Sequence, residues 1–342
     1  MDKLAVVILN WNGRELLDKY LPSVIKYSNI PEVSVYVIDN GSKDDSIDIL
    51  NKKFAEVKII KLEQNFGFAG GYNKGLEQIS AKYFVLLNSD VEVTDGWITP
   101  IISLLDSNDD IAACQPKLKS FLNKDEFEYA GAAGGYIDKY GFAFCRGRLF
   151  NVFEKDNGQY NSSSNIFWAT GACLFIRSEL YHKVGGLDFD FFAHMEEIDL
   201  CWRLNSRGYK IVYEPKSEVF HLGGATLSKT NPHKTFLNFR NNLFLLYKNL
   251  PAEKVFNVIF IRMVLDGVAA IKFLFSLEFR NFWAVFRAHI NFYISINKFK
   301  QKRIQNLKEM KIKEHSTIYN GSIVMDFFFR KKKYFSDLHF NP

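Results

Sequence analysis

Cysteine is scarce in this chain of 342 residues, and long uninterrupted apolar runs are missing. The four cysteines lie far apart, at positions 114, 145, 173 and 201, and fit no spacing of metal ligands. Such isolated thiols are typical of free, buried cysteines in a reducing compartment. The N-terminal apolar run, residues 4–9, is too short for the core of a signal peptide, so we expect a cytoplasmic protein.

Two common nucleotide-binding signatures are also absent. The chain has neither the GxGxxG spacing of dinucleotide-binding folds nor the GxxxxGKS or GxxxxGKT spacing of a P-loop. A different glycine-rich stretch, residues 67–75, stands where a helix is expected to begin. Turns of this kind let backbone amides approach a phosphate closely, so a phosphate site of another type is compatible with the sequence.

The net charge of +6 is unevenly spread. Residues 298–342 contain eleven Lys and Arg against four Asp and Glu, so the remainder of the chain sums to −1. The basic character therefore belongs to the C-terminal tail, and we expect no nucleic-acid partner.

Apolar runs alternate with helical periodicity over the first 95 residues. Strands are predicted at residues 4–9, 33–38, 57–62 and 83–87, with helices over 14–27, 47–54 and 67–79. This order implies βαβ units, a mostly parallel sheet and an α/β fold. We expect a nucleotide-binding half over 1–95 and an acceptor half over 96–235, in which residues 123–165 form a long, partly irregular insertion that shapes a substrate pocket.

Carboxylates follow two of these predicted strands. Asp39 ends one, and Asp90 follows another after Asn88 and Ser89. Because ligands of open α/β sheets bind at the carboxyl ends of the strands, Asp39 is placed to accept hydrogen bonds from a base or ribose, and Asp90 to ligate a divalent cation. The alternative is a plain turn, since Asn, Ser and Asp all favour turns.

A second acidic cluster contains Glu196, Glu197 and Asp199. At the start of a helix it would be stabilised by the helix dipole, with Asp199 pairing to Arg203 four residues on. The alternative is catalytic, because a carboxylate beside the reacting centre can act as a general base toward a sugar hydroxyl.

The region 236–342 is predicted to be helical and basic. Residues 255–277 are strongly apolar, yet they are too charged for a membrane-spanning helix. On a helix, a polar arc would contain Arg262, Asp266, Ala269, Lys272 and Ser276. An amphipathic helix in a membrane surface fits this pattern, with Trp283, Phe286 and Tyr293 as aromatic anchors and residues 298–313 as a basic flank. The alternative is a core helix of a small helical domain.

Several ordered motifs give the chain a family resemblance. They are VVILNWNG at 6–13, VIDNGS at 37–42, NFGFAGGYN at 65–73, LLNSD at 86–90, WATGA at 168–172, VGGLD at 184–188, EEIDLCWR at 196–203 and HLGG at 221–224. In this order the chain resembles an inverting glycosyltransferase of family 2 with the GT-A fold, and within it the bacterial rhamnosyltransferase-like enzymes. The resemblance covers about residues 4–245.

The resemblance implies a nucleotide-diphosphate-sugar donor and a divalent metal, Mg²⁺ or Mn²⁺. Asp90, in the place of the DXD motif, and His221 would be the metal ligands. Glu197 would be the general base. The implied nucleotide-binding residues are Asn10, Trp11, Asp39, Asn65, Gly67, Asn73, Asn88 and Ser89. The implied contacts to the acceptor or donor sugar are Trp168, Thr170, Gly171, Glu196 and Asp199. Arg240 would contact a phosphate or serve as a packing residue.

Two positions depart from the family pattern. Asn88 replaces the first acid of DXD, which removes one anionic ligand, and Glu197 replaces an Asp that is shorter by one methylene. The expected activity is transfer of a sugar, with rhamnose as the candidate, to a lipid-linked or cell-surface polysaccharide precursor at the inner face of the membrane. The alternatives are a non-catalytic nucleotide-sugar-binding scaffold and a nucleotidyltransferase.

Overall fold

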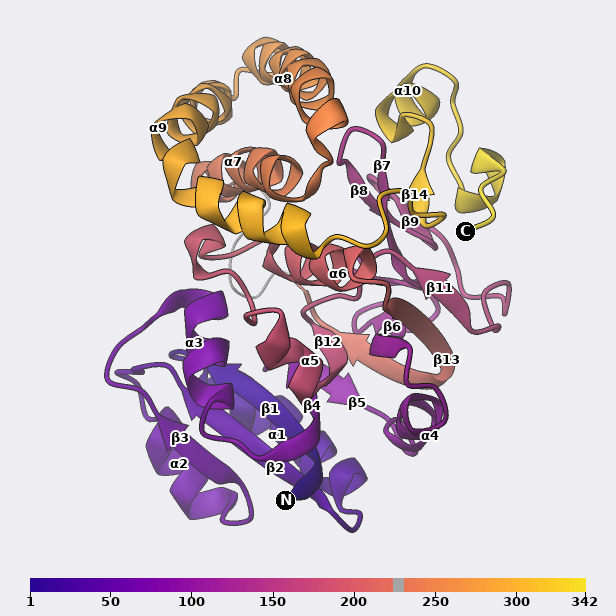
Figure 1. The fold of residues 1–342 in the computed structure, drawn as a ribbon. Helices are drawn as coiled ribbons and strands as arrows, with labels where there is room; N and C mark the ends of the chain where they lie inside the picture. The colour runs from indigo at the N-terminus through magenta and orange to yellow at the C-terminus, as the bar shows by residue number, and fades with distance from the viewer. Residues whose placement is uncertain (224–230) are drawn as a thin grey trace.

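A nine-stranded sheet forms the centre of the computed structural model, which describes residues 1–223 and 231–342 (Figure 1). Gly224 of the HLGG motif lies outside the described residues. The strand order is β11-β13-β6-β12-β4-β1-β2-β3, and β5 pairs with β13 beside this path. The strands are β1 (Asp2–Asn10), β2 (Val33–Asp39), β3 (Lys58–Lys61), β4 (Ala81–Leu87), β5 (Val91–Val93), β6 (Ile111–Ser120), β11 (Ser164–Ile166), β12 (Cys173–Arg177) and β13 (Lys210–His221).

The predicted α/β fold is confirmed, and its parallel part lies where the sequence placed it. β3, β2, β1 and β4 are parallel neighbours, whereas β12 runs antiparallel between β4 and β6. Apolar clusters on both faces of the sheet explain why these strands are continuous runs of Val, Ile and Leu. The flanking helices are α1 (Arg14–Ser28), α2 (Ser46–Lys53), α3 (Gly67–Leu76), α4 (Thr99–Ser107), α5 (Ser178–Lys183) and α6 (Glu196–Ser206).

Residues 123–165 are more regular than predicted. They contribute most of a second sheet of order β10-β9-β8-β7-β14. Its strands are β7 (Gly135–Asp138), β8 (Ala143–Cys145), β9 (Arg148–Leu149), β10 (Val152–Phe153) and β14 (Ile318–Tyr319). Strands of two to four residues are too short to show an alternating pattern, and β14 comes from near the C-terminus.

β13 is one long strand, Lys210–His221, that continues through an irregularity. A register shift against β6 between Glu214 and Glu218 surrounds Pro215, which cannot donate a ladder hydrogen bond. The irregularity hides the continuity of the strand from the sequence pattern. In the apolar stretch over 166–176, Ile166 ends β11, which pairs with β13, and Cys173 begins β12, which pairs with β4 and β6.

The C-terminal helices are α7 (Pro232–Asn249), α8 (Ala252–Phe275), α9 (Phe279–Glu309) and α10 (Ile323–Phe328). α8 and α9 form a hairpin at one end of the molecule, and α7 packs against both (Figure 1). Among the helices of the described ranges, none combines the length and apolar character needed to cross a bilayer. The division of the chain near residue 235 stays a prediction.

A buried ionic network fastens α7 to α6. The Lys248 ammonium is 2% exposed and lies 2.6 Å from Asp188 Oδ2 and 2.8 Å from Asp199 Oδ2. Arg203 Nε lies 2.9 Å from the same oxygen of Asp199. Buried charges are tolerated only when they are paired in this way, so the network fixes how the two helices dock.

Replacement of Lys248 tests this network. Lys248→Met keeps the length of the side chain but leaves two buried carboxylates short of a cation, so we expect the free energy of unfolding to fall by about 3–5 kcal/mol. The free energy of unfolding is measured by urea denaturation monitored with circular dichroism. The control Lys53→Met breaks the exposed pair with Asp18 and should cost at most about 1 kcal/mol. Equal losses in the two variants would contradict this account.

Candidate active site

The nucleotide edge of the site is built by the ends of β1 and β2. Asn10 and Asp39 are register partners, and Asn10 Nδ2 donates a hydrogen bond of 3.2 Å to Asp39 Oδ1. The backbone N–H of Ser42 donates to Asp39 Oδ2. Asn10 Oδ1 is buried and has no partner among the described residues, so it is an unused acceptor. Trp11 beside it is 52% exposed, which leaves its ring free to cover a ligand.

The turn at Asn65 and Gly67 lies against this edge through Asn40, a residue that the sequence did not single out. Asn40 Nδ2 donates to Asn65 Oδ1 and to the Gly67 carbonyl, both at 3.0 Å. Gly67 begins α3 with φ of +73°, a conformation that favours glycine. Asn40 directly follows the predicted Asp39, and this position in the sequence could have identified Asn40 as a residue of the site.

Asn73 has a different environment from the other predicted nucleotide residues. Its Oδ1 accepts from the Tyr181 hydroxyl and the Leu187 N–H, and its Nδ2 donates to the Leu187 carbonyl at 2.7 Å. These bonds tie α3 to the turn after α5. Asn73 thus has a structural role, and the geometry offers no support for nucleotide contact there.

The loop after β4 joins the nucleotide edge to the predicted metal ligands. A Cβ at Gly13 would lie 2.5 Å from Asn10 Oδ1 and 4.0 Å from Ser89 Oγ, so Gly13 packs between them. The Asn88 N–H donates to the Ala172 carbonyl at 3.0 Å. The loop is therefore held on one side by the β1 turn and on the other by the segment before β12.

Asp90 and His221 meet, although 130 residues of chain separate them. His221 Nε2 lies 3.1 Å from Asp90 Oδ1, and both side chains are buried. His221 Nδ1 lies 3.3 Å from Glu128 Oε1. Burial opposes charge on the imidazole, but Glu128 and Asp90 outweigh it and raise the His221 pKa to about 10. Glu128 was missed because it stands in the insertion without any motif.

Asp90 and His221 would offer a divalent cation one carboxylate oxygen and, once the imidazole has lost its proton, one ring nitrogen. The part of the chain that the structure describes has no group of three or more His, Cys, Asp and Glu side chains able to hold a metal. A site with two protein ligands suits a metal that is completed by substrate phosphates and water. The contact of Glu128 with the other ring nitrogen would fix the orientation of the ring if His221 held a metal.

Glu197 stands half-buried in the first turn of α6. Burial raises its pKa to about 6, and its Oε2 has no partner within the described ranges. A Cβ at Gly171 would lie 3.9 Å from Glu197 Cβ and 3.4 Å from the Phe68 ring. Since the next residue, Ala172, binds Asn88, these contacts bring Glu197 and Gly171 to the end of the sheet that holds Asp90.

Glu196, beside the predicted base, is fully enclosed. Burial, and then repulsion from Glu197, raises its pKa well above the usual range. Its Oε2 also lacks a partner among the described residues. Because burial favours the protonated form of Glu196, Glu197 is the more readily ionised carboxyl of the two.

The strained segment before α6 is held in place by α7. Phe192, His194 and Met195 have φ of 67°, 69° and 74°, which is uncommon for residues other than glycine. Asn241 Nδ2 lies 2.8–2.9 Å from the carbonyls of Phe191, Ala193 and His194.

Arg240 supports the same segment. Its Nη2 donates to the Phe191 carbonyl at 3.1 Å and to Asn241 Oδ1 at 2.8 Å. Its guanidinium also lies over the Phe236 and Phe244 rings. These contacts show the packing role of Arg240, and its contact with a phosphate stays a prediction.

Three predicted sugar contacts are corrected. Asp199 is 0% exposed, and its oxygens are bound by Arg203, Lys248 and Asn249. The predicted ion pair of Asp199 with Arg203 is therefore present, and no oxygen of Asp199 is left for a sugar. The buried Trp168 indole donates to the Tyr136 carbonyl, and the buried Thr170 hydroxyl accepts from the Ala172 N–H. Side chains enclosed in this way support the site from within and do not border a bound sugar.

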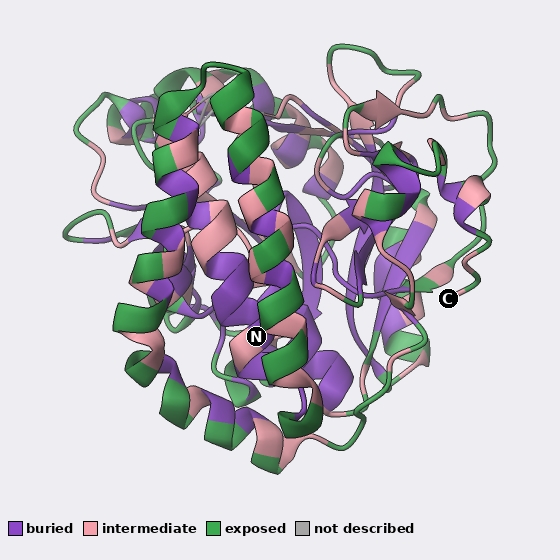
Figure 2. Ribbon diagram, turned by 90° about the horizontal axis from the view of Figure 1, so that it is seen from above, coloured by how far each residue is buried: buried purple, intermediate pink, exposed green. Residues whose placement is uncertain are grey.

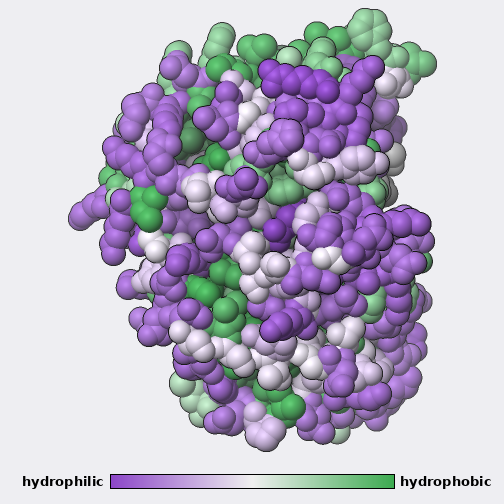
Figure 3. Space-filling view, turned by 90° about the vertical axis from the view of Figure 1, so that its right-hand side faces the viewer, coloured by the Kyte–Doolittle hydropathy of each residue, from purple (hydrophilic) through white to green (hydrophobic). Residues whose placement is uncertain are grey.

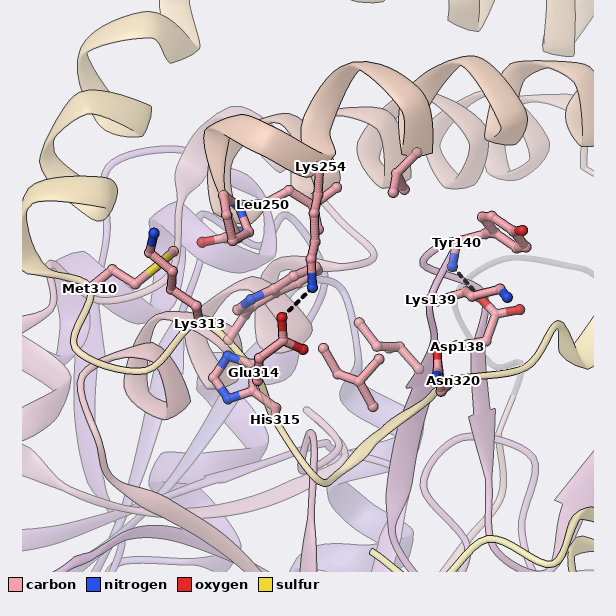
Figure 4. Close-up of a pocket in the computed structure, with 16 residues that line it drawn as sticks. Asp138, Lys139, Tyr140, Leu250, Lys254, Met310, Lys313, Glu314, His315 and Asn320 are labelled. Atoms are coloured by element: carbon pink, nitrogen blue, oxygen red, sulfur yellow. Dashed lines mark hydrogen bonds and ion pairs between the residues drawn. The ribbon is translucent and has the colours of Figure 1, made fainter.

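A cavity of about 360 Å³ lies elsewhere, between the start of α8, the end of α9 and β7 (Figure 4). Asp138, Lys139, Lys254, Glu314 and His315 are among its lining residues, and Lys254 and Glu314 form an ion pair across it. None of the predicted site residues lines this cavity, so it is separate from the candidate active site.

Asn241 supplies a test of how the strained segment before α6 is held. Asn241→Ala removes the donor to three carbonyls, so we expect unfolding free energy to fall by about 1–3 kcal/mol. We also expect faster amide hydrogen exchange over residues 191–197. Hydrogen exchange with mass spectrometry measures it, with the exposed Asn257→Ala as the matched control. If the exchange rates in residues 191–197 stay unchanged in Asn241→Ala, the hydrogen bonds of Asn241 do not hold this segment in place.

Comparison with known proteins gives the family of the chain. The family model described as "Glycosyl transferase family 2" matches residues 5–185. The chain is 25% identical over 238 residues to N-acetylglucosaminyl-diphospho-decaprenol L-rhamnosyltransferase of Mycobacterium tuberculosis, which covers 64% of this chain and 76% of that relative. It is 27% identical over 229 residues to poly-beta-1,6-N-acetyl-D-glucosamine synthase of Staphylococcus epidermidis, covering 66% and 52%.

Solved structures share the fold. GalNAc-T7 with UDP, GalNAc and Mn²⁺ matches with a TM-score of 0.56 and 17% identity, covering 74% of this chain and 49% of that one. The mannosyltransferase PcManGT of Pyrobaculum calidifontis, with GDP-Man and Mn²⁺, matches with a TM-score of 0.50 and 10% identity, covering 90% and 84%. The fold is thus the predicted GT-A fold, and the family match over more than half of the chain identifies this protein as a member of glycosyltransferase family 2.

Proposed function

We propose that this glycosyltransferase moves a sugar, with inversion, from a nucleotide-diphosphate-sugar to a hydroxyl of a lipid-linked or cell-surface polysaccharide precursor. The observation that carries the proposal is the convergence of three groups at one end of the sheet. They are the Asn10–Asp39 pair, the Asp90–His221 pair and Glu197. These groups would bind the nucleotide, hold a cation and accept a proton.

The donor nucleotide would lie along the ends of β1 and β2. The unused Asn10 Oδ1 and the Asp39 carboxylate offer acceptors for the N–H groups of a base or for ribose hydroxyls. The exposed Trp11 ring is available to stack on the base. Asn65, Gly67, Asn88 and Ser89 stay in the proposed nucleotide site because their turns flank this edge.

Asp90 and His221 would hold a Mg²⁺ or Mn²⁺ ion, and two structural neighbours contain Mn²⁺. When bound, such an ion supplies positive charge against the leaving diphosphate. Because Asn88 stands in place of an acid, the site has one anionic protein ligand in the 88–90 loop, so metal affinity should depend strongly on the phosphates. Glu128 would keep the His221 ring oriented.

Glu197 would take the proton of the acceptor hydroxyl as that oxygen attacks the anomeric carbon from the face opposite the leaving diphosphate. A pKa of about 6 leaves it ionised at neutral pH yet basic enough to assist. Glu197 exceeds Asp by one methylene, and its unpartnered Oε2 leaves it free to turn toward an acceptor. Gly171 packs near Glu197 and has no side chain, so it would leave space for the sugar there.

Rhamnose is the candidate sugar. The support is the mycobacterial relative, named as a rhamnosyltransferase acting on a decaprenol-linked substrate. The staphylococcal relative is named for a polymer of N-acetylglucosamine, so relatives of similar identity differ in the sugar. A lipid-linked acceptor would place the protein at the inner face of the cytoplasmic membrane as a peripheral enzyme.

A donor-hydrolysis and transfer assay tests this function. Purified protein is incubated with a panel of nucleotide-sugars, with and without Mn²⁺, and nucleotide release is measured. We expect one donor to be turned over and Glu197→Gln to lower the rate by about 100-fold or more with donor affinity kept. Because a base must be deprotonated, the wild-type rate should fall as the pH drops below about 6.

The exposed Glu179→Gln is the matched control and should keep the wild-type rate. A non-catalytic scaffold would bind a donor without any turnover, and its donor binding would not respond to Glu197→Gln. Either that result, or full activity in the Glu197 variant, would overturn the proposal.

A further inference from the structure

The outward face of α8 and of the first half of α9 carries many exposed apolar side chains. On α8, Phe256, Phe260, Val264 and Phe275 recur at helical spacing and are 53–83% exposed. On α9, Trp283, Phe286, Ile290 and Ile294 continue the surface and are 44–73% exposed. We call this surface the apolar face. Figure 2 shows exposed residues recurring along both helices, and Figure 3 shows hydrophobic residues gathered along the same end of the molecule.

The polarity of this hairpin is reversed relative to an ordinary surface helix. Arg262 and Asp266 on α8 are buried, 5% and 1% exposed, and their side chains are 2.7 Å apart. His289 of α9 lies 3.2 Å from the other oxygen of Asp266, and Arg262 also binds Asn242 of α7. Of the predicted polar arc, Arg262 and Asp266 thus pack on the protein, whereas Lys272 and Ser276 are exposed. The alternative of a core helix does not describe α8, in which the buried residues are Arg262, Asp266 and Ala270. A surface helix in water normally shows the opposite arrangement.

Positive charge accompanies the apolar face. Residues 252–309 contain ten Lys and Arg against four Asp and Glu, a surplus equal to the net charge of the whole chain. Lys272, Arg280, Arg287, Lys298 and Lys300 are exposed members of this set. Aromatic and aliphatic side chains next to exposed cations match a bilayer interface, where acyl chains lie beneath anionic headgroups.

We propose that the apolar face inserts into the interfacial layer of a bilayer containing anionic lipids. The assignment rests on the proposed function, because a lipid-linked acceptor would then be presented beside the enzyme. A second copy of the chain fits less well, since twofold pairing through this face would bring two basic surfaces together. Large exposed apolar patches are rare on soluble monomers and mark interaction sites.

The hairpin is also connected to the catalytic segment. Lys302 of α9 lies 2.6 Å from Asp190 Oδ2 and 2.5 Å from Asp188 Oδ1. These carboxylates belong to the segment that leads into α6 and Glu197. Insertion of the apolar face would therefore fix the active site at a constant height above the membrane.

Vesicle flotation tests the proposal. We use the full chain with vesicles of phosphatidylcholine and phosphatidylglycerol, and with vesicles of phosphatidylcholine alone. The wild type should float with the anionic vesicles. The triple variant Phe260→Ser, Trp283→Ser and Phe286→Ser should bind at least about tenfold less, because three large apolar side chains no longer leave water. Leu122→Ser, at a residue 74% exposed and outside the hairpin, is the matched control and should bind as the wild type.

Donor hydrolysis in the same preparations keeps the two proposals apart. The triple variant alters only exposed side chains, so its circular dichroism spectrum and its hydrolysis rate without vesicles should match the wild type. Absence of wild-type flotation, or flotation of the triple variant at the wild-type level, would overturn the membrane proposal while hydrolysis stands. A dimer in light scattering that the triple variant splits, without vesicle binding, would assign the face to self-association.

Discussion

The parallel register of β1, β2 and β4 is the constraint on which the site depends. Asn10 pairs with Asp39, and Ile8 pairs with Leu87 three residues before Asp90. Because parallel strands end at the same edge of a sheet, this register alone brings the polar residues after each strand together. Every slip by one residue would turn the apolar side chains of a strand to the other face, so two buried faces hold the register firmly.

The second half of the site depends on buried polar groups. α6 carries Glu197, and its position follows from Asp199 bonded to Arg203 and Lys248 inside the protein. The segment before α6 adopts left-handed backbone angles that are stabilised by Asn241. Strain of this kind persists only where surrounding contacts over-determine it, which is common beside catalytic groups. The position of Glu197 is thus maintained at a cost in local strain.

The sequence predicted the first 95 residues well, because buried parallel strands are continuous apolar runs and their ends are marked by Asp39 and Asp90. It also identified the pairing of Asp199 with Arg203. It failed where signals are short or distant. Glu128 and Asn241 belong to no motif and reach the site only through tertiary contacts. Strands β7–β10 are too short to show an alternating pattern. The face that α8 turns to the solvent depends on what packs against the helix.

The central claim is that Asp90, His221 and the Asn10–Asp39 edge bind one metal–nucleotide complex. Crystals grown with Mn²⁺ and the nucleoside diphosphate released from the active donor test it by anomalous diffraction. The account predicts one manganese peak within coordination distance of Asp90 and His221, with the base against Asp39 and Trp11. A peak elsewhere, or a nucleotide bound in the cavity beside Lys254 and Glu314, would contradict it.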